Sequence, residues 1–358
     1  GITHDLTVGL RYDDITNEGA GFSLAFDPPL PPGPNKNIYN PIRLPEPVRV
    51  GNKIDFGTQE TNSLVAQATD FIELTPWLTV LAGVGFVNLD QPTAGYEESR
   101  VSPIGGVTVT PADNLSVYAS YAEALEVGGF APLDPLFTNA GEQFEPIVSE
   151  QYEIGTKYQF RRMNLTAAYF NIDRAFTFTV DNGDGTFTFV QDGRQVHKGF
   201  EFAAFGDITD DLYVIGSFNI INPSFERAGD PDVAGNGVFG TIPIIEGNEP
   251  AGVSDFAARL FASYEFSQTI PGLTLTGGLR HKSSQFLTPS NLQQTPDWTV
   301  FDLGASYDLS AVSDADAVFR IQVDNVTDRR YWNGVSFGGF GLSVGDARTL
   351  RASLTIGF

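Results

Sequence analysis

Apolar and polar residues alternate regularly at the C-terminal end of the chain, in the segment 349–358, which reads TLRASLTIGF. Leu350, Ala352, Leu354 and Ile356 fall on one side of an extended backbone, and the intervening threonine, arginine and serine residues fall on the other. Successive side chains of a β-strand point to opposite faces, so this segment predicts a strand with one apolar and one polar face.

The same alternation recurs along the whole chain and predicts about 14 strands. No long stretch has helical periodicity, so the chain is expected to be all-β. The predicted strands are residues 5–13, 61–71, 77–86, 101–110, 114–123, 151–160, 164–173, 198–206, 211–220, 255–266, 273–281, 299–309, 317–325 and 349–358.

The connections between these strands alternate between short and long. Transmembrane β-barrels of the outer membrane have short periplasmic turns and long extracellular loops, whereas a soluble sandwich has no reason to place its long loops at one end. The pattern therefore predicts a transmembrane antiparallel β-barrel. The short connections are 73–76, 111–114, 161–163, 207–211, 267–272 and 310–317, and the long ones are 14–60, 87–99, 124–150, 174–196, 222–253, 282–297 and 326–347.

Aromatic residues recur where strands enter the short turns. Membrane barrels carry aromatic girdles at both interfaces, so these residues predict the periplasmic girdle. An unpaired strand edge in lipid would leave backbone groups without partners, and we therefore expect the last strand to pair with the first and close the barrel. The girdle residues are Trp77, Tyr158, Phe160, Tyr264, Phe266, Tyr307 and the terminal Phe358.

Composition excludes several classes of function. The chain has 358 residues, no cysteine and a net charge of −23, so disulfides, thiolate metal sites and nucleic acid partners are not expected. His4, His197 and His281 accompany no nucleophile elbow, phosphate loop or metal-spaced cluster. We therefore expect no enzyme activity, no metal and no cofactor.

Charged residues on the polar side of the predicted strands would face the lumen. They allow two interpretations: a transverse field that guides polar or anionic solutes, or paired charges that stiffen the wall. The cations are Arg11, Lys157, Arg259, Arg280, Arg320 and Arg351, and the acids are Glu153, Glu201, Glu265, Asp302 and Asp324.

Several segments resemble, in order, the C-terminal part of TonB-dependent receptors, a family of outer-membrane siderophore transporters. They are HDLTVGLRYD (4–13), NLSVYASYAEALEVG (114–128), EPIVSEQYEIGTKYQF (145–160), HKGFEFAAFGDITDDL (197–212) and DNVTDRRYW (324–332). The terminal aromatic also resembles the signal that the barrel-assembly machinery recognises. The resemblance implies a location in the outer membrane of a Gram-negative bacterium.

The resemblance further implies that aromatic residues in the long loops cradle a siderophore, although packing of loop on loop would need the same residues. These candidates are Tyr39, Phe130, Phe137, Tyr331, Trp332, Phe337 and Phe340.

The plug domain and TonB box of the family have no counterpart in residues 1–358, which we expect to form a single barrel domain. Large receptors of this type have about 22 strands around a plugged lumen. The chain is therefore either a fragment or a reduced barrel that closes with fewer strands. TonB is an expected partner only if a plug exists.

Three functions remain open. The first is capture of an iron chelate, such as a ferric siderophore, in the extracellular loops, followed by passage through the lumen. The others are a plugless passive channel resembling a porin and a structural or adhesive surface barrel. Expected partners are outer-membrane lipid and lipopolysaccharide. Association of several copies into a homo-oligomer is a further alternative.

Overall fold

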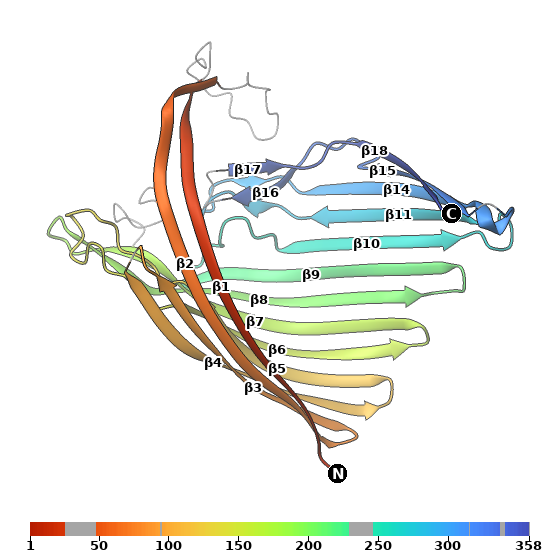
Figure 1. Cartoon of the computed structure of the whole chain (residues 1–358), viewed down its shortest axis with the longest axis horizontal. Helices are drawn as coiled ribbons and strands as arrows, with labels where there is room; N and C mark the ends of the chain where they lie inside the picture. Colours follow the sequence, from red (N-terminus) through yellow and green to blue (C-terminus); the bar gives the residue numbers. More distant parts are fainter. Residues whose placement is uncertain (26–47, 94, 229–245, 315, 337–340, 358) are drawn as a thin grey trace.

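A computed structural model describes residues 1–25, 48–93, 95–228, 246–314, 316–336 and 341–357. They form a 14-stranded antiparallel sheet in which neighbours in the chain are neighbours in the sheet, so the predicted strand number and all-β class are confirmed (Figure 1). Its strands are β1 (Thr3–Ala25), β2 (Val48–Thr75), β3 (Leu78–Gln91), β4 (Tyr96–Ala112), β5 (Leu115–Glu126), β6 (Ile147–Phe160), β7 (Met163–Asp181), β8 (Phe187–Asp207), β9 (Leu212–Arg227), β10 (Phe256–Glu265), β11 (Leu273–Lys282), β14 (Trp298–Asp308), β15 (Ala317–Asp324) and β18 (Thr349–Ile356).

The sheet is open, and the prediction that its last strand pairs with its first is wrong. Within the described residues β1 pairs with β2 alone and β18 with β15 alone. The N-terminal end of β1 and the C-terminal end of β18 lie far apart (Figure 1). Side-chain alternation predicts pairing between successive strands, whereas closure depends on strand tilt, stagger and curvature summed over the whole sheet.

The turns at one end of the sheet are short, as predicted, but several predicted long loops consist largely of strand. β3 and β4 continue until only residues 92–95 connect them, in place of the predicted loop 87–99. β7 and β8 likewise continue into the predicted loop 174–196. Backbone pairing in a hairpin satisfies the main chain outside the membrane as well as inside it, so strands need not end at the interface.

The remaining connections at the loop end contain two small sheets, of β12 (Gln285–Phe286) with β13 (Gln294–Thr295) and β16 (Trp332–Ser336) with β17 (Gly341–Val344). No helix in the described ranges is long and apolar enough to cross a membrane.

Buried apolar side chains gather at the loop end of the sheet rather than between its strands. One cluster contains Phe176, Phe178 and Phe225, and another contains Trp298, Val300 and Tyr331. The sheet itself is one layer thick, so most of its apolar side chains stay exposed on one face. This is the arrangement expected when lipid replaces a protein core.

Candidate functional site

Directly opposite residues of neighbouring strands share a face, so strand register assigns every side chain of the sheet to one of two faces. Ile154, Tyr169, Phe200 and Ile220 form one continuous row across β6 to β9. Each of the four is between 40 and 56% exposed. This apolar side is the outer face, which lipid covers.

The opposite, inner face carries the polar residues. Gly155, Ala168, Glu201 and Asn219 form a continuous row there, adjacent to the apolar row of the outer face. The inner face is not uniformly polar, because Phe261 and Ile215 are exposed on it near the short turns. The eleven charged residues predicted to face the lumen all lie on this face by register.

The structure brings only a few of these eleven charges together. Arg280 Nε lies 3.2 Å from Asp302 Oδ2, and Arg351 Nη1 lies 2.7 Å from Asp324 Oδ2. Arg11 pairs instead with Asp13, a residue outside the predicted set, at 2.8 Å. The other charges are spread along the wall and do not form one compact site.

Three of the inner charges without an ion partner make other contacts. Glu153 accepts a hydrogen bond from the Tyr118 hydroxyl and another, of 3.0 Å, from Gln151. Lys157 Nζ lies 5.4 Å from the centre of the Tyr118 ring, a cation–π distance. Arg320 donates to the Thr355 hydroxyl at 3.3 Å. Both predicted roles, field and wall stiffening, thus have residues that suit them.

Three loop segments fold together at the extracellular end of the inner face: residues 246–255, 283–297 and 325–348 in their described parts. Gly252 N donates to Phe286 O at 2.9 Å, and Asn248 Nδ2 donates to Pro289 O at 3.0 Å. Lys282 Nζ reaches Asn333 O at 3.4 Å. The segments are therefore held together by hydrogen bonds that backbone carbonyl groups accept.

Asn325 anchors the last of these segments. It is fully buried, and its φ of 50° lies in the left-handed region that asparagine tolerates better than most residues. Its side-chain amide donates to the carbonyl groups of Arg329 at 2.8 Å and Asp346 at 2.9 Å. Its backbone N–H donates to Asp302 at 2.8 Å. One residue thus connects loop and wall, a role that sequence reasoning missed.

Tyr331 is buried between the loop segment 325–348 and the wall, and it does not belong to an exposed rim. Its ring centre lies 4.3 Å from that of Trp298, it is 7% exposed, and it lies against Gly345. Val300, on the inner face beneath it, is fully buried. The segment 325–348 therefore covers the inner face here, and Tyr331 serves packing between loop and wall.

A second loop unit joins residues 127–146 to the β7–β8 hairpin. Thr138 N donates to Phe187 O, and Phe187 N donates to Leu136 O, both at 2.8 Å. The Phe137 ring lies 5.9 Å from that of Phe187. Phe137 is therefore a packing residue in this structure, whereas Phe130, from the same segment, is 44% exposed.

The other aromatic candidates divide in the same way. Trp332 is half-buried at the start of β16, and Tyr39, Phe337 and Phe340 lie outside the described residues.

The girdle candidates lie at the short-turn end of the sheet, where Trp77 is 52% exposed in the β2–β3 turn. Tyr158 and Phe160 stack at 6.3 Å, Tyr264 and Phe266 meet at 4.8 Å, Tyr307 lies opposite Phe319, and Phe358 lies outside the described residues.

Charged residues replace apolar ones on the outer face toward the loop end of β6 to β9. We call this the outer charged band, formed by Glu150, Asp173, Arg194, Lys198 and Glu226. Arg194 lies 2.5 Å from Asp173 and 2.7 Å from Glu226, which also pairs with Lys198 at 3.1 Å. The band and the girdle candidates lie at opposite ends of the apolar part of the outer face.

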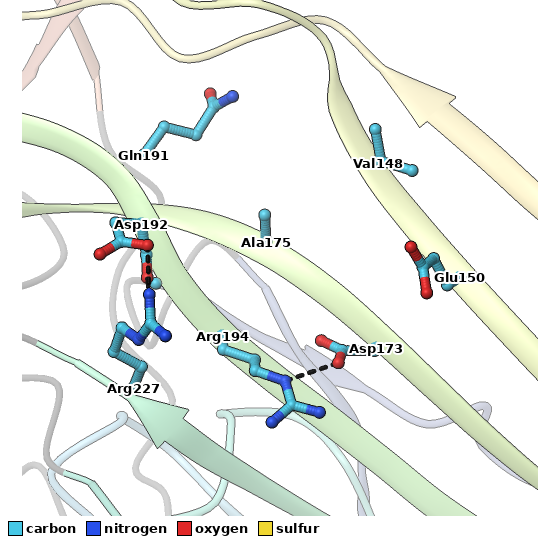
Figure 2. A pocket seen from close by; sticks show the side chains of 9 residues that line it. Val148, Glu150, Asp173, Ala175, Gln191, Asp192, Arg194 and Arg227 are labelled. Carbon is cyan, nitrogen blue, oxygen red and sulfur yellow. Dashed lines mark hydrogen bonds and ion pairs between the residues drawn. The ribbon is translucent and has the colours of Figure 1, made fainter. Parts of the chain in front are cut away.

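A cavity of about 240 Å³ opens at this band (Figure 2). Arg194 and Arg227 approach it from β8 and β9, and each is held by a carboxylate, Asp173 and Asp192 respectively. Glu150 and Val148 of β6 line the other side. Because both guanidinium groups are already paired, the cavity offers no unpaired cation to a ligand.

Glu249 is a titratable group of the packed loops whose pKa is shifted. Its partial burial raises the pKa of its carboxyl above the ordinary value, and the nearby carboxylate of Asp255 raises it further. Glu249 N also donates to Asn291 Oδ1 at 2.7 Å, so the residue lies at the contact between two of the loop segments.

The single-layered sheet, its apolar outer face, short turns at one end and packed loops at the other define the wall of an outer-membrane β-barrel. Residues 1–326 match the family described as "TonB dependent receptor-like, beta-barrel", and the chain belongs to that family. It is accordingly an outer-membrane protein of a Gram-negative bacterium. The family resemblance inferred from the sequence motifs is thereby confirmed.

Individual relatives are receptors and transporters. The chain is 32% identical over its whole length to the ferrichrome receptor FcuA of Yersinia enterocolitica, of which it covers 46%. It is 26% identical to the ferrichrome outer membrane transporter/phage receptor of Escherichia coli K12, again covering 46%. The chain thus spans about half the length of the curated relatives it matches.

Among solved structures, BauA, the ferric preacinetobactin receptor of Acinetobacter baumannii, is similar in fold. It superposes with a TM-score of 0.79 at 23% identity, covering 99% of this chain and 51% of BauA. At that identity the likeness concerns the fold alone, and it supports the assignment of the open sheet to the barrel class.

Proposed function

We propose that the protein captures a ferric siderophore in its extracellular loops and passes it inward along the inner face. The observation that carries the proposal is the match of the family over residues 1–326, together with the match of two ferrichrome receptors over the full length of this chain. Ferrichrome is therefore the first ligand to test. On this proposal the protein performs no catalysis.

The loop architecture supports a role in ligand capture. Loop segments that are tied to each other and to the wall present a pre-formed surface, which lowers the entropy cost of binding. Phe130 is the described aromatic candidate with the most exposed ring, and it belongs to the loop unit of residues 127–146, where it is bridged to Gln143. We propose that it contacts the ligand, whereas Phe137 and Tyr331 support the surface from within.

The surroundings of the wall complete the proposal. The outer face would contact lipid and, at the outer charged band, lipopolysaccharide headgroups, and the girdle residues would lie at the periplasmic interface. Residues 1–358 would act as one domain, delivered by the barrel-assembly machinery. Energised uptake through TonB would require a plug.

The test is uptake of iron-labelled ferrichrome by cells that lack their own ferrichrome receptor and express the whole native polypeptide containing this sequence. We expect saturable uptake, with the half-saturation concentration raised about tenfold by Phe130→Ala, as for loss of about 1.4 kcal/mol of aromatic contact. Val312→Ala, an exposed apolar truncation in the β14–β15 turn, is the control and should change nothing. Steady conductance without saturable binding would instead support the passive channel.

A further inference from the structure

Two arginine residues lie directly opposite each other on the inner face. Arg259 of β10 and Arg280 of β11 are register partners in the antiparallel pair. Like charges at directly opposite positions destabilise a sheet unless other groups compensate them. The surroundings of this pair therefore show whether both charges are neutralised.

Only one of the two charges, that of Arg280, is neutralised by a carboxylate. Arg280 contacts both oxygens of Asp302, with Nε–Oδ2 at 3.2 Å and Nη2–Oδ1 at 3.4 Å. Asp302 also accepts the backbone N–H of Asn325, so its capacity is shared. Arg259 is exposed and has no ion pair with any residue that the structure describes. One positive charge is thus left over in a chain whose net charge is −23.

Neutral hydrogen-bond donors lie beside that free guanidinium. Ser217 of β9 is the register partner of Arg259, and Asn219 follows on the same face. Arg259, Ser217 and Asn219 line one cavity of about 230 Å³. Neither the Ser217 hydroxyl nor the Asn219 amide has a hydrogen-bond partner among the described residues, so both are available to a ligand.

A second cavity, of about 310 Å³, adjoins the first on the other side of Arg259. Its lining includes Arg280 together with the exposed side chains of Ile215 and Phe261. The two cavities together offer a cation, neutral donors and an apolar edge. A fork of guanidinium N–H groups is suited to bidentate binding of a carboxylate or phosphate.

We propose that Arg259, Ser217 and Asn219 form an oxyanion-binding site on the inner face, which takes a carboxylate or phosphate group beside the apolar edge made by Phe261. Arg259 supplies the charge, since the charge of Arg280 is neutralised by Asp302. The proposal relies on the inner face being the lumen side, as in the proposed function, but on no siderophore and no transport step.

The experiment measures the rate at which phenylglyoxal, an arginine-specific reagent, modifies Arg259 in the whole native polypeptide, read by peptide mass spectrometry. Arg320 is the internal reference, because it lies on the same face without an ion pair and outside both cavities. Citrate and inorganic phosphate, compared at equal ionic strength with chloride, are the probes. We expect citrate at about ten times its dissociation constant to slow the modification of Arg259 about tenfold, with Arg320 unchanged.

A second pair of variants distinguishes a free anion from a carboxylate of the native protein itself. If Arg259 resists the reagent without added anion, Arg259→Glu should lower the unfolding temperature of the native polypeptide while Arg259→Lys preserves it, which would assign the oxyanion to the protein. Arg259 that reacts readily in chloride and equally fast with citrate or phosphate would overturn the site. Resistance combined with a harmless Arg259→Glu would overturn it as well.

Because the readout is binding and not uptake, it is independent of the siderophore hypothesis. Protection of Arg259 in a protein that takes up no ferrichrome would leave the oxyanion site standing.

Discussion

At the scale of single residues, glycine decides where aromatic rings can lie flat on the inner face. Phe170 packs over Gly199 of the neighbouring strand, and Tyr118 packs over Gly155. Each ring occupies the volume that a Cβ would need. Strand-internal glycine is usually unfavourable, so these positions are explained by the ring that covers them.

Gly199→Ala should destabilise the wall by about 1–3 kcal/mol, the usual cost of overpacking. The new Cβ would lie 2.6 Å from the Ile220 carbonyl oxygen and would also meet the Phe170 ring. Gly85→Ala is the matched control, because the nearest atom to its added Cβ, Ser102 O, is 3.8 Å away. Urea titration of the detergent-solubilised protein measures both, and equal midpoints would contradict the packing argument.

Glu249 predicts a pH dependence that is confined to the loops. The pKa of its carboxyl is raised in the folded protein, so the protonated form is favoured there. Its contribution to loop stability is therefore complete below the unfolded pKa of about 4.3 and is lost as pH rises through the folded pKa. We expect amide hydrogen exchange in residues 246–255, corrected for intrinsic rates, to show more opening at neutral pH than in acid.

Glu249→Gln should remove this pH dependence, because glutamine does not titrate. Glu246→Gln, in the same segment, should keep it. A profile that is unchanged in the Glu249 variant would show that another group controls the loop.

At the scale of the strand, period-two alternation places each side chain in one of two solvents. On β6, Tyr158 lies at the girdle and Glu150 in the outer charged band, and Ile154 lies midway between them on the same face. Ser120 of β5 is at a similar height but faces inward, opposite Glu153. Substitutions at Ile154 and Ser120 therefore test which face of the sheet contacts lipid and how deep in the membrane these positions lie.

Ile154→Arg should cost about 2–4 kcal/mol, as expected for arginine near the bilayer midplane on the lipid face. Ser120→Arg should cost little, because the new guanidinium meets water and Glu153. Heat-modifiable mobility of the folded protein on a detergent gel reports assembly of both. Normal assembly of the Ile154 variant alongside failure of the Ser120 variant would reverse the assignment of the faces.

At the scale of the whole molecule, the two sheet edges remain apart. An edge exposes unpaired N–H and C=O groups, which are costly in lipid, so the open edges of β1 and β18 require partners in the membrane. The two ferrichrome relatives are about twice the length of this chain, which covers 46% of each.

Because the chain has no cysteine, paired cysteine substitutions can test the arrangement of the edges. Ile321→Cys with Ala352→Cys places thiols at register partners of β15 and β18, and we expect a disulfide to form readily. Leu10→Cys with Ala352→Cys joins the two outermost strands, and we expect no intramolecular bridge. A bridge within one molecule in the second variant would show that the barrel closes with these strands.

Residue patterns predicted the strand number and the two faces of the sheet well, because each depends on short-range alternation. They failed at closure and at loop length. The burial of Tyr331 was not predictable either, since it requires Trp298 and Gly345 to meet across distant segments. The outer charged band was missed although its residues alternate with apolar ones on β6 and β8. The sequence alone does not show how far along the membrane normal a charged side chain lies.

By itself, therefore, the sequence determined a one-layered antiparallel sheet with an apolar and a polar face, since side-chain alternation and turn chemistry are local properties of the backbone. The tertiary structure alone decided that the edges stay apart, that Asn325 ties a loop to the wall, and that Arg259 keeps an unpaired charge beside Ser217. Curvature, loop contacts and charge pairing depend on which distant residues meet, and local pattern carries no information about such meetings.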